Sequence, residues 1–255
     1  MSNTAVCGNR LSFELHRQGN TFRQIRQGIY LITRHAKCNN LDDAMLKAIL
    51  FDIDNTLLYT EKANIRFYQE ILVRSGYRKP SAGKIKLNFS LAMRDMLNIL
   101  LDGKPKAEIA KVYEYARTIP FYDYDALKVP GGAIKALDAL RSKYELAVVT
   151  SRIKAGAVEA LSRKNMLQYF RTIVAYEDCL NPKPNPEPLL IALERLDIGP
   201  SNAVYIGDAK SDMQAASAAG VYFIAYGSKV PDARFRATRF NQIPRLLRSV
   251  ERDLK

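Results

Sequence analysis

Five short segments along the chain are almost continuously apolar and rich in β-branched residues. They are residues 46–53, 145–150, 172–175, 203–206 and 221–225. Short segments of this kind are typical of strands that are covered on both faces of a sheet. The pattern therefore predicts five strands in a buried sheet.

Helical periodicity follows the last four of these segments. The predicted helices span residues 155–164, 187–196, 211–219 and 243–254. Strands that alternate with helices are typical of a parallel sheet, because each helix carries the chain back to the starting edge. The expected fold class is therefore α/β, with a doubly wound parallel sheet.

A long insertion follows the first apolar segment, which about ninety residues separate from the second. Helical periodicity recurs in it at residues 62–75, 91–101, 105–117 and 133–143. The stretch is too long for a simple crossover, so we predict a small all-helical domain at residues 61–127. The core would then comprise residues 45–60 and 128–255, with the helical domain over the edge where open α/β sheets bind ligands.

Residues 1–44 differ from the rest of the chain. They are polar, rich in Arg, Gln and Asn, and show no sustained period. We expect either a poorly ordered N-terminal extension or a mis-assigned start, in which case Met45 would be the natural first residue.

Composition narrows the class of protein. Of 255 residues, 47% are apolar and 25% charged, which excludes a disordered, collagenous or fibrous chain. Three widely spaced cysteines, Cys7, Cys38 and Cys179, indicate reduced thiols rather than disulfides or a zinc site. No apolar run approaches the ~18 residues of a membrane span, and no secretory signal is evident. We expect a cytoplasmic protein with no membrane partner.

The net charge of +13 favours anionic partners such as nucleic acid or phosphorylated metabolites. Residues 229–255 hold eight basic and three acidic residues. A solvated amphipathic helix is the favoured interpretation of this segment, because charge patterning alone is weak evidence of binding. The sequence leaves the oligomeric state open between monomer and homodimer.

Candidate chemistry begins where the first predicted strand ends, at Asp52 and Asp54. Two carboxylates two residues apart can both reach the carboxyl edge of the sheet. The alternative is a pair of aspartates that cap a turn.

Later strand ends add further polar groups. These are Thr150 and Ser151 after the second strand, Lys183 in a proline-rich turn after the third, and Asp208 and Asp212 after the fourth. Each has a structural alternative as a helix cap, a turn residue or a first-turn acid. Together they indicate phosphoryl chemistry, because clustered carboxylates suit Mg²⁺ while lysine and hydroxyl groups suit phosphate oxygens.

These elements, in this order, resemble the haloacid dehalogenase superfamily of phosphohydrolases. FDIDNTLL resembles its first motif, VVTSR the second, KPNPEP the third and GDAKSD the fourth, and the match extends from Met45 to about Tyr226. The resemblance implies a Rossmann-like core, a helical cap inserted after the first motif, and Mg²⁺ as cofactor.

The resemblance also implies roles for single residues. Asp52 would be the nucleophile that forms an aspartyl-phosphate, and Asp54 the general acid and base. Mg²⁺ would be held by Asp52, the backbone carbonyl of Asp54, Asp208 and Asp212. The phosphate-binding residues would be Thr150, Ser151 and Lys183. Asn55 stands where glycine is frequent in the family, and asparagine tolerates left-handed backbone angles.

The cap would select the substrate. The segment from Thr60 to Leu72 is similar to the first cap helix of the phosphoglycolate phosphatase and β-phosphoglucomutase branch. Asn88, Phe89 and Arg94 fall where those relatives place a specificity loop, although the segment lacks the glycines of phosphoglycolate phosphatases.

The leading hypothesis is a Mg²⁺-dependent phosphatase of small phosphorylated metabolites. A phosphomutase, or a pyrophosphatase or nucleotidase, on the same scaffold is the alternative within the superfamily. From another class, the basic segments would suit a nucleic-acid-binding protein with a vestigial core. The complete set of motif residues argues against nucleic acid as partner, since a vestigial core has no need of them.

Overall fold

The structure is a computed structural model that describes residues 45–118 and 122–254. The predicted N-terminal extension, residues 1–44, lies outside the described residues.

Six parallel strands form one sheet in the order β3-β2-β1-β4-β5-β6. The strands are β1 (Ala48–Phe51), β2 (Glu145–Val149), β3 (Thr172–Val174), β4 (Ala203–Gly207), β5 (Tyr222–Tyr226) and β6 (Phe235–Ala237). The predicted α/β fold class, a Rossmann-like parallel sheet, is confirmed. Strand β6 was not predicted, because its sequence, Phe-Arg-Ala, has an exposed arginine at the middle position and so no continuous apolar run.

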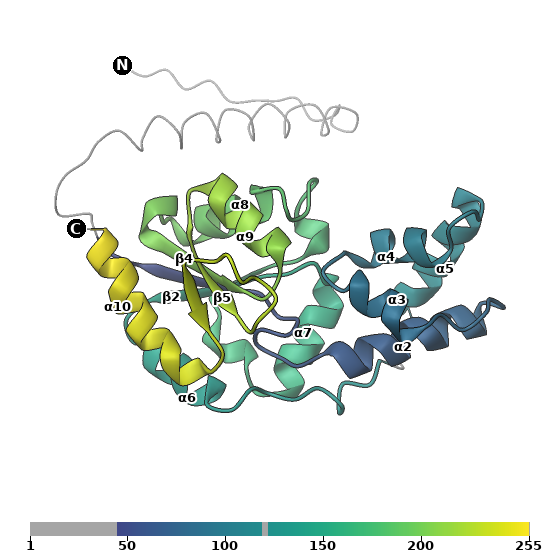
Figure 1. The fold of residues 1–255 in the computed structure, drawn as a ribbon, viewed down its shortest axis with the longest axis horizontal. Coiled ribbons are helices and arrows are strands. Elements are labelled where there is room, and N and C mark those ends of the chain that lie inside the picture. The colour runs from purple at the N-terminus through teal and green to yellow at the C-terminus, as the bar shows by residue number, and fades with distance from the viewer. Residues whose placement is uncertain (1–44, 119–121, 255) are drawn as a thin grey trace, which may run out of the picture. The chain divides into compact units, whose positions relative to one another are not determined.

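Helices cover both faces of this sheet (Figure 1). On one face lie α6 (Ala133–Leu140), α7 (Lys154–Arg163) and α10 (Ile243–Asp253). On the other lie α8 (Glu187–Leu196) and α9 (Lys210–Ala219). The described residues also form the short 3-10 helices η2 (Leu167–Tyr169), η3 (Tyr176–Asp178), η4 (Pro200–Asn202) and η5 (Phe240–Gln242).

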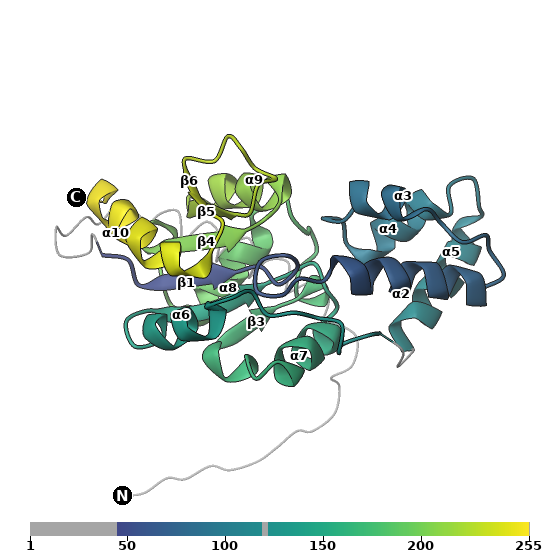
Figure 2. The same cartoon turned by 60° about the horizontal axis from the view of Figure 1, so that its bottom comes forward.

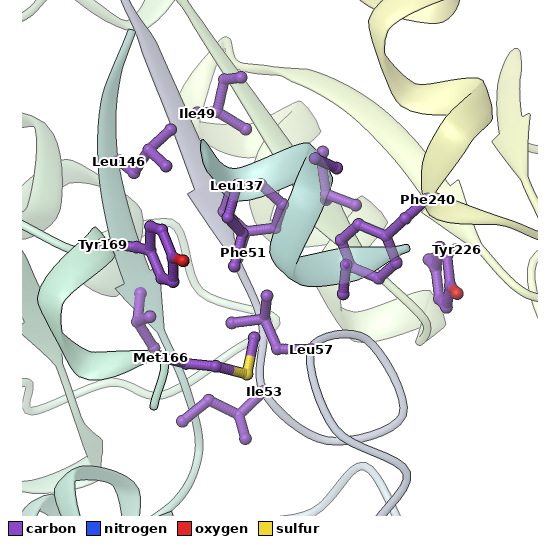
Figure 3. Close-up of a cluster of buried hydrophobic side chains, with 14 of the residues drawn as sticks. Ile49, Phe51, Ile53, Leu57, Leu137, Leu146, Met166, Tyr169, Tyr226 and Phe240 are labelled. Carbon is purple, nitrogen blue, oxygen red and sulfur yellow. The ribbon is translucent and has the colours of Figure 1, made fainter. Parts of the chain in front are cut away.

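Strand β1 lies at the centre of the sheet, and all four of its residues are buried. Ile49 and Phe51 pack on the side of α6, whereas Ala48 and Leu50 pack on the side of α8. Figure 3 shows Phe51 beside Leu137 of α6, with Phe240 nearby. Consecutive residues of β1 face opposite helical layers, and both layers are apolar. Every residue of the strand must therefore be apolar, which explains the continuous apolar run.

The insertion after β1 forms four helices with their own buried cluster of apolar residues. They are α2 (Glu61–Arg74), α3 (Ala82–Leu87), α4 (Met93–Leu100) and α5 (Lys106–Thr118). Figure 2 shows them grouped beyond the loop that leaves β1. Helix α3 was not predicted, because it buries one residue, Ile85, and so has no apolar period.

The two ends of the insertion lie side by side, where the chain leaves the core and where it re-enters it. The Tyr59 N–H donates to the Lys128 carbonyl at 2.8 Å, and the two residues form an antiparallel bridge.

Among the described residues, no helix is both long and apolar enough to cross a bilayer.

Candidate active site

Asp52 and Asp54 lie in the loop that follows β1. The Asp52 N–H continues the sheet by donating to the Ile206 carbonyl at 2.9 Å. The chain then turns sharply at Asn55, whose φ of 55° is left-handed, as expected for asparagine at this position. This turn lets both carboxylates reach the carboxyl edge of the sheet.

Asp208 and Asp212 reach the same edge from β4 and α9. Asp208 directly follows β4, and Asp212 stands in the first turn of α9, where its Oδ2 accepts the Ala209 N–H at 3.0 Å. Together with Asp52 these residues form a buried cluster, and one carboxylate oxygen of each lies within 4.8 Å of the others.

Gly207 makes this approach possible. A Cβ atom at Gly207 would lie 2.5 Å from Asp212 Oδ2 and 2.8 Å from Asp212 Cβ. Because the Cβ of Asp212 is fixed to the backbone, the side chain cannot avoid this clash by rotating.

We therefore expect Gly207→Ala to displace Asp212 and to lower the free energy of unfolding by about 1–3 kcal/mol, as overpacking does. Because Asp212 is one of the three clustered carboxylates, any affinity of the cluster for Mg²⁺ should fall at the same time. Urea unfolding and Mg²⁺ titration measure the two effects, with Gly83→Ala as the control, since a Cβ at Gly83 meets nothing within 4 Å. Unchanged Mg²⁺ binding in the folded Gly207→Ala protein would contradict this prediction.

Lys183 neutralises part of the cluster. Its Nζ lies 2.9 Å from Asp52 Oδ1, 2.7 Å from Asp212 Oδ1 and 2.8 Å from the Tyr205 hydroxyl. The lysine side chain is 5% exposed. Tyr205 was missed by the sequence analysis, and the only signal was a polar aromatic residue inside an apolar strand.

Burial sets the protonation of this group. It raises the pKa of Asp52 well above its usual range. The Lys183 ammonium lowers this pKa in part, whereas the nearby Asp212 carboxylate raises it further. Burial also raises the pKa of Asp208 to about 6. The pKa of Lys183 is raised despite its burial, because Asp212 and Asp52 stabilise the charged form. A cation in the cluster would therefore relieve repulsion among its carboxylates.

Lys229 contacts the cluster from the loop after β5. Its Nζ lies 2.6 Å from Asp208 Oδ2 and 5.5 Å from the centre of the Phe89 ring. In the sequence, this lysine is distinguished only as part of the basic C-terminal segment.

Asp54 belongs to a second polar network. Arg152 binds its carboxylate in a bidentate manner, with Nε and Nη2 each 2.8 Å from an oxygen. Arg152 Nη2 also donates to the Tyr122 hydroxyl at 2.7 Å, and Thr60 and Asn64 donate to the Asp54 carboxylate. Although burial alone would raise the pKa of Asp54, Arg152 lowers it below the usual range. Arg152 was not predicted, although it ends the VVTSR motif.

Thr150 and Ser151 occupy different positions at the end of β2. The buried Thr150 accepts the Arg152 N–H on its Oγ1 at 3.2 Å. Ser151, unlike Thr150, lines a cavity at this edge of the sheet.

A cavity of about 580 Å³ is lined in part by Asp52, Asp54, Lys183, Asp208 and Asp212. The insertion contributes an aromatic part of its wall, from α2 and from the turn after α3. The aromatic residues from that side include Phe67, Tyr68 and Phe89.

The three predicted specificity residues are placed differently. Phe89 lines the cavity, whereas Asn88 and Arg94 do not. Asn88 instead ends α3 and donates its side-chain amide to the Lys84 carbonyl. Arg94 is exposed and stacks on Tyr113, with its guanidinium carbon 4.6 Å from the ring centre.

The residues of the cluster fit a magnesium ion. All three ligands are hard oxygen donors. Opposite ligands of Mg²⁺ lie about 4.2 Å apart, so small shifts of these side chains suffice. The buried Ser211 hydroxyl on the cavity wall has no partner among the described residues, and a hydrated ion would supply one.

The parallel sheet, with buried carboxylates and a lysine gathered at its carboxyl edge, defines an α/β enzyme. The chain belongs to the haloacid dehalogenase-like hydrolase family, whose model matches residues 49–226. The resemblance seen in the sequence is thereby confirmed.

Three relatives are informative. A phosphoglycolate phosphatase from Nitrosospira multiformis is 29% identical over 71% of this chain and 84% of the relative. A phosphorylated carbohydrates phosphatase from Thermotoga maritima is 32% identical over 69% of this chain and 82% of the relative. The crystal structure of a HAD-superfamily hydrolase from Geobacter sulfurreducens matches with a TM-score of 0.62 and 30% identity, over 79% of this chain and 96% of that one.

Proposed function

We propose that this protein is a Mg²⁺-dependent phosphatase that hydrolyses small phosphorylated metabolites through an aspartyl-phosphate on Asp52. The observation that carries the proposal is the cluster of Asp52, Asp208 and Asp212 around Lys183 at the inner end of one cavity. Relatives named as phosphatases support the same reaction type.

In the first half of the reaction, a carboxylate oxygen of Asp52 attacks phosphorus. The bond between phosphorus and the ester oxygen breaks, and the leaving oxygen takes a proton from Asp54. The Lys183 ammonium, 2.9 Å from Asp52, stabilises negative charge on the transferring oxygens. Ser151 and the N–H groups that follow β2 would assist it.

In the second half, Asp54 removes a proton from water, which attacks the phosphorus of the aspartyl-phosphate. Inorganic phosphate leaves and the Asp52 carboxylate is restored. The bidentate contact of Arg152 with Asp54 suits this half, because it favours the ionised form that accepts a proton, and the proton gained here is the one that Asp54 gives to the next leaving oxygen.

Asp52, Asp208, Asp212 and the Asp54 carbonyl would hold Mg²⁺. When bound, this ion would reduce the repulsion between the anionic nucleophile and the anionic phosphate.

We also propose that residues 61–127 act as a cap over this site, between core segments 45–60 and 128–255. Their helices have a separate apolar core, and Phe67, Tyr68 and Phe89 line the same cavity as the carboxylates. The leaving group would contact these rings, so they would select the substrate.

The test is release of inorganic phosphate from a panel of phosphate esters, with Mg²⁺ or with EDTA. The panel contains phosphoglycolate, hexose phosphates, nucleotides, pyrophosphate and p-nitrophenyl phosphate. We expect steady, Mg²⁺-dependent release from at least one small ester. A requirement for a sugar bisphosphate activator would identify a phosphomutase instead. Folded protein that releases no phosphate from any substrate would refute the proposal.

A further inference from the structure

We propose that Lys229 is a displaceable counter-ion of the carboxylate cluster, which binds Asp208 in the absence of a divalent cation and gives way to that cation. The inference rests on the metal site of the proposed function and goes beyond it. It concerns a residue outside the four motifs.

The first observation is the contact itself. Lys229 Nζ lies 2.6 Å from Asp208 Oδ2, one of the carboxylates that form the cluster. The Asp208 side chain is 9% exposed, whereas that of Lys229 is 51% exposed. The lysine therefore reaches a buried carboxylate from solvent and can withdraw without disturbing the core.

The second observation is the contrast with Lys183. That residue is 5% exposed and bound to Asp52, Asp212 and Tyr205 at once, so it is part of the interior. Within the described part of the chain, Lys229 has one ion-pair partner, Asp208. Of the two lysines, Lys229 is the one that an incoming cation can replace.

The third observation concerns charge. Asp52, Asp208 and Asp212 with both ammonium groups carry a formal net charge of −1. A divalent cation would make this +1 if both lysines stayed, but zero if Lys229 left. Because the site is largely removed from water, the neutral arrangement is favoured.

The Phe89 ring provides a place for the displaced ammonium group. Its centre lies 5.5 Å from Lys229 Nζ, within the range of a cation–π contact. Phe89 and Lys229 both line the cavity, so the ammonium group can release Asp208 and keep its contact with the ring.

The experiment is calorimetric titration of the substrate-free full chain with MgCl₂. Lys229→Met removes the competing charge but keeps an unbranched side chain. We expect it to bind Mg²⁺ roughly two- to fivefold more tightly than the wild type, the range that a half-exposed ion pair supports. Lys229→Arg should not bind more tightly than the wild type.

Lys210→Met is the matched control. Lys210 is exposed and lines the same cavity, but it has no ion-pair partner among the described residues. Removing its charge should change Mg²⁺ affinity less than Lys229→Met does. An equal gain in both variants would show a general effect of cavity charge and would overturn the specific role of Lys229.

Thermal unfolding supplies a second readout. In EDTA, Lys229→Met should melt below the wild type, because Asp208 loses its counter-ion. Saturating Mg²⁺ should raise its melting temperature more than that of the wild type, since tighter binding to the folded state stabilises it more.

Equal or weaker Mg²⁺ binding by Lys229→Met would overturn the inference while leaving the metal site intact. A wild-type protein that shows neither heat nor a melting shift with Mg²⁺ would instead refute the metal site of the proposed function, and the inference with it. The two failures are therefore distinguishable.

Discussion

Asp52→Asn is expected to abolish steady-state phosphate release, with a loss of about 10⁴-fold or more, because the amide is not a competent nucleophile. The protein should remain folded. The side chain keeps its size, and its amide oxygen can still accept the hydrogen bond of Lys183 that Asp52 Oδ1 accepts at 2.9 Å. Phosphate release and thermal unfolding of the same sample measure the two effects.

Asp138→Asn is the control for this experiment. Asp138 lies on α6, where its side chain is half exposed and pairs with Arg141, away from the cavity. It should keep wild-type activity. Substantial turnover by Asp52→Asn would show that another group receives the phosphoryl group, and would remove the central step of the proposed mechanism.

Lys183→Met is expected to produce the largest loss of stability. It leaves the Asp52 and Asp212 carboxylates, whose side chains are 7% and 2% exposed, without their shared counter-ion. Removing one partner of a buried ion pair costs about 3–5 kcal/mol of the free energy of unfolding. Turnover should fall as well, because the transferring oxygens lose a fixed positive charge.

Urea unfolding in EDTA and in Mg²⁺ tests this prediction. Mg²⁺ should recover part of the lost stability in Lys183→Met, because it supplies positive charge to the same carboxylates. Lys229→Met should lose much less in EDTA, since the side chain of Lys229 is 51% exposed. If Lys183→Met unfolds at the urea concentration of the wild type, Lys183 does not provide the counter-charge that its contacts indicate.

The interior of the sheet was predictable from sequence because each buried strand must be apolar on both faces. Strand β1 is buried at all four positions, and its apolar run was recognisable without any partner. Helix α3 and strand β6 were not predictable on this basis, because each buries a single residue and so has no such requirement.

The same logic explains which site residues could be found. Asp52, Lys183, Asp208 and Asp212 follow strands whose carboxyl ends meet at one edge of a parallel sheet, so their proximity follows from topology alone. The structure brings these four residues together. Asn88 and Arg94 were placed by analogy with a loop, and neither lines the cavity.

The sequence by itself determined five of the six strands, most of the long helices, and the residues that stand at the ends of those strands. Only the tertiary structure decided how those residues are paired. Asp54 is bound by Arg152, 98 residues away, and Asp208 by Lys229, from a loop with no motif. Such pairs depend on side-chain direction and loop conformation, which many distant packing contacts set together, whereas apolar periodicity is a local property of the chain.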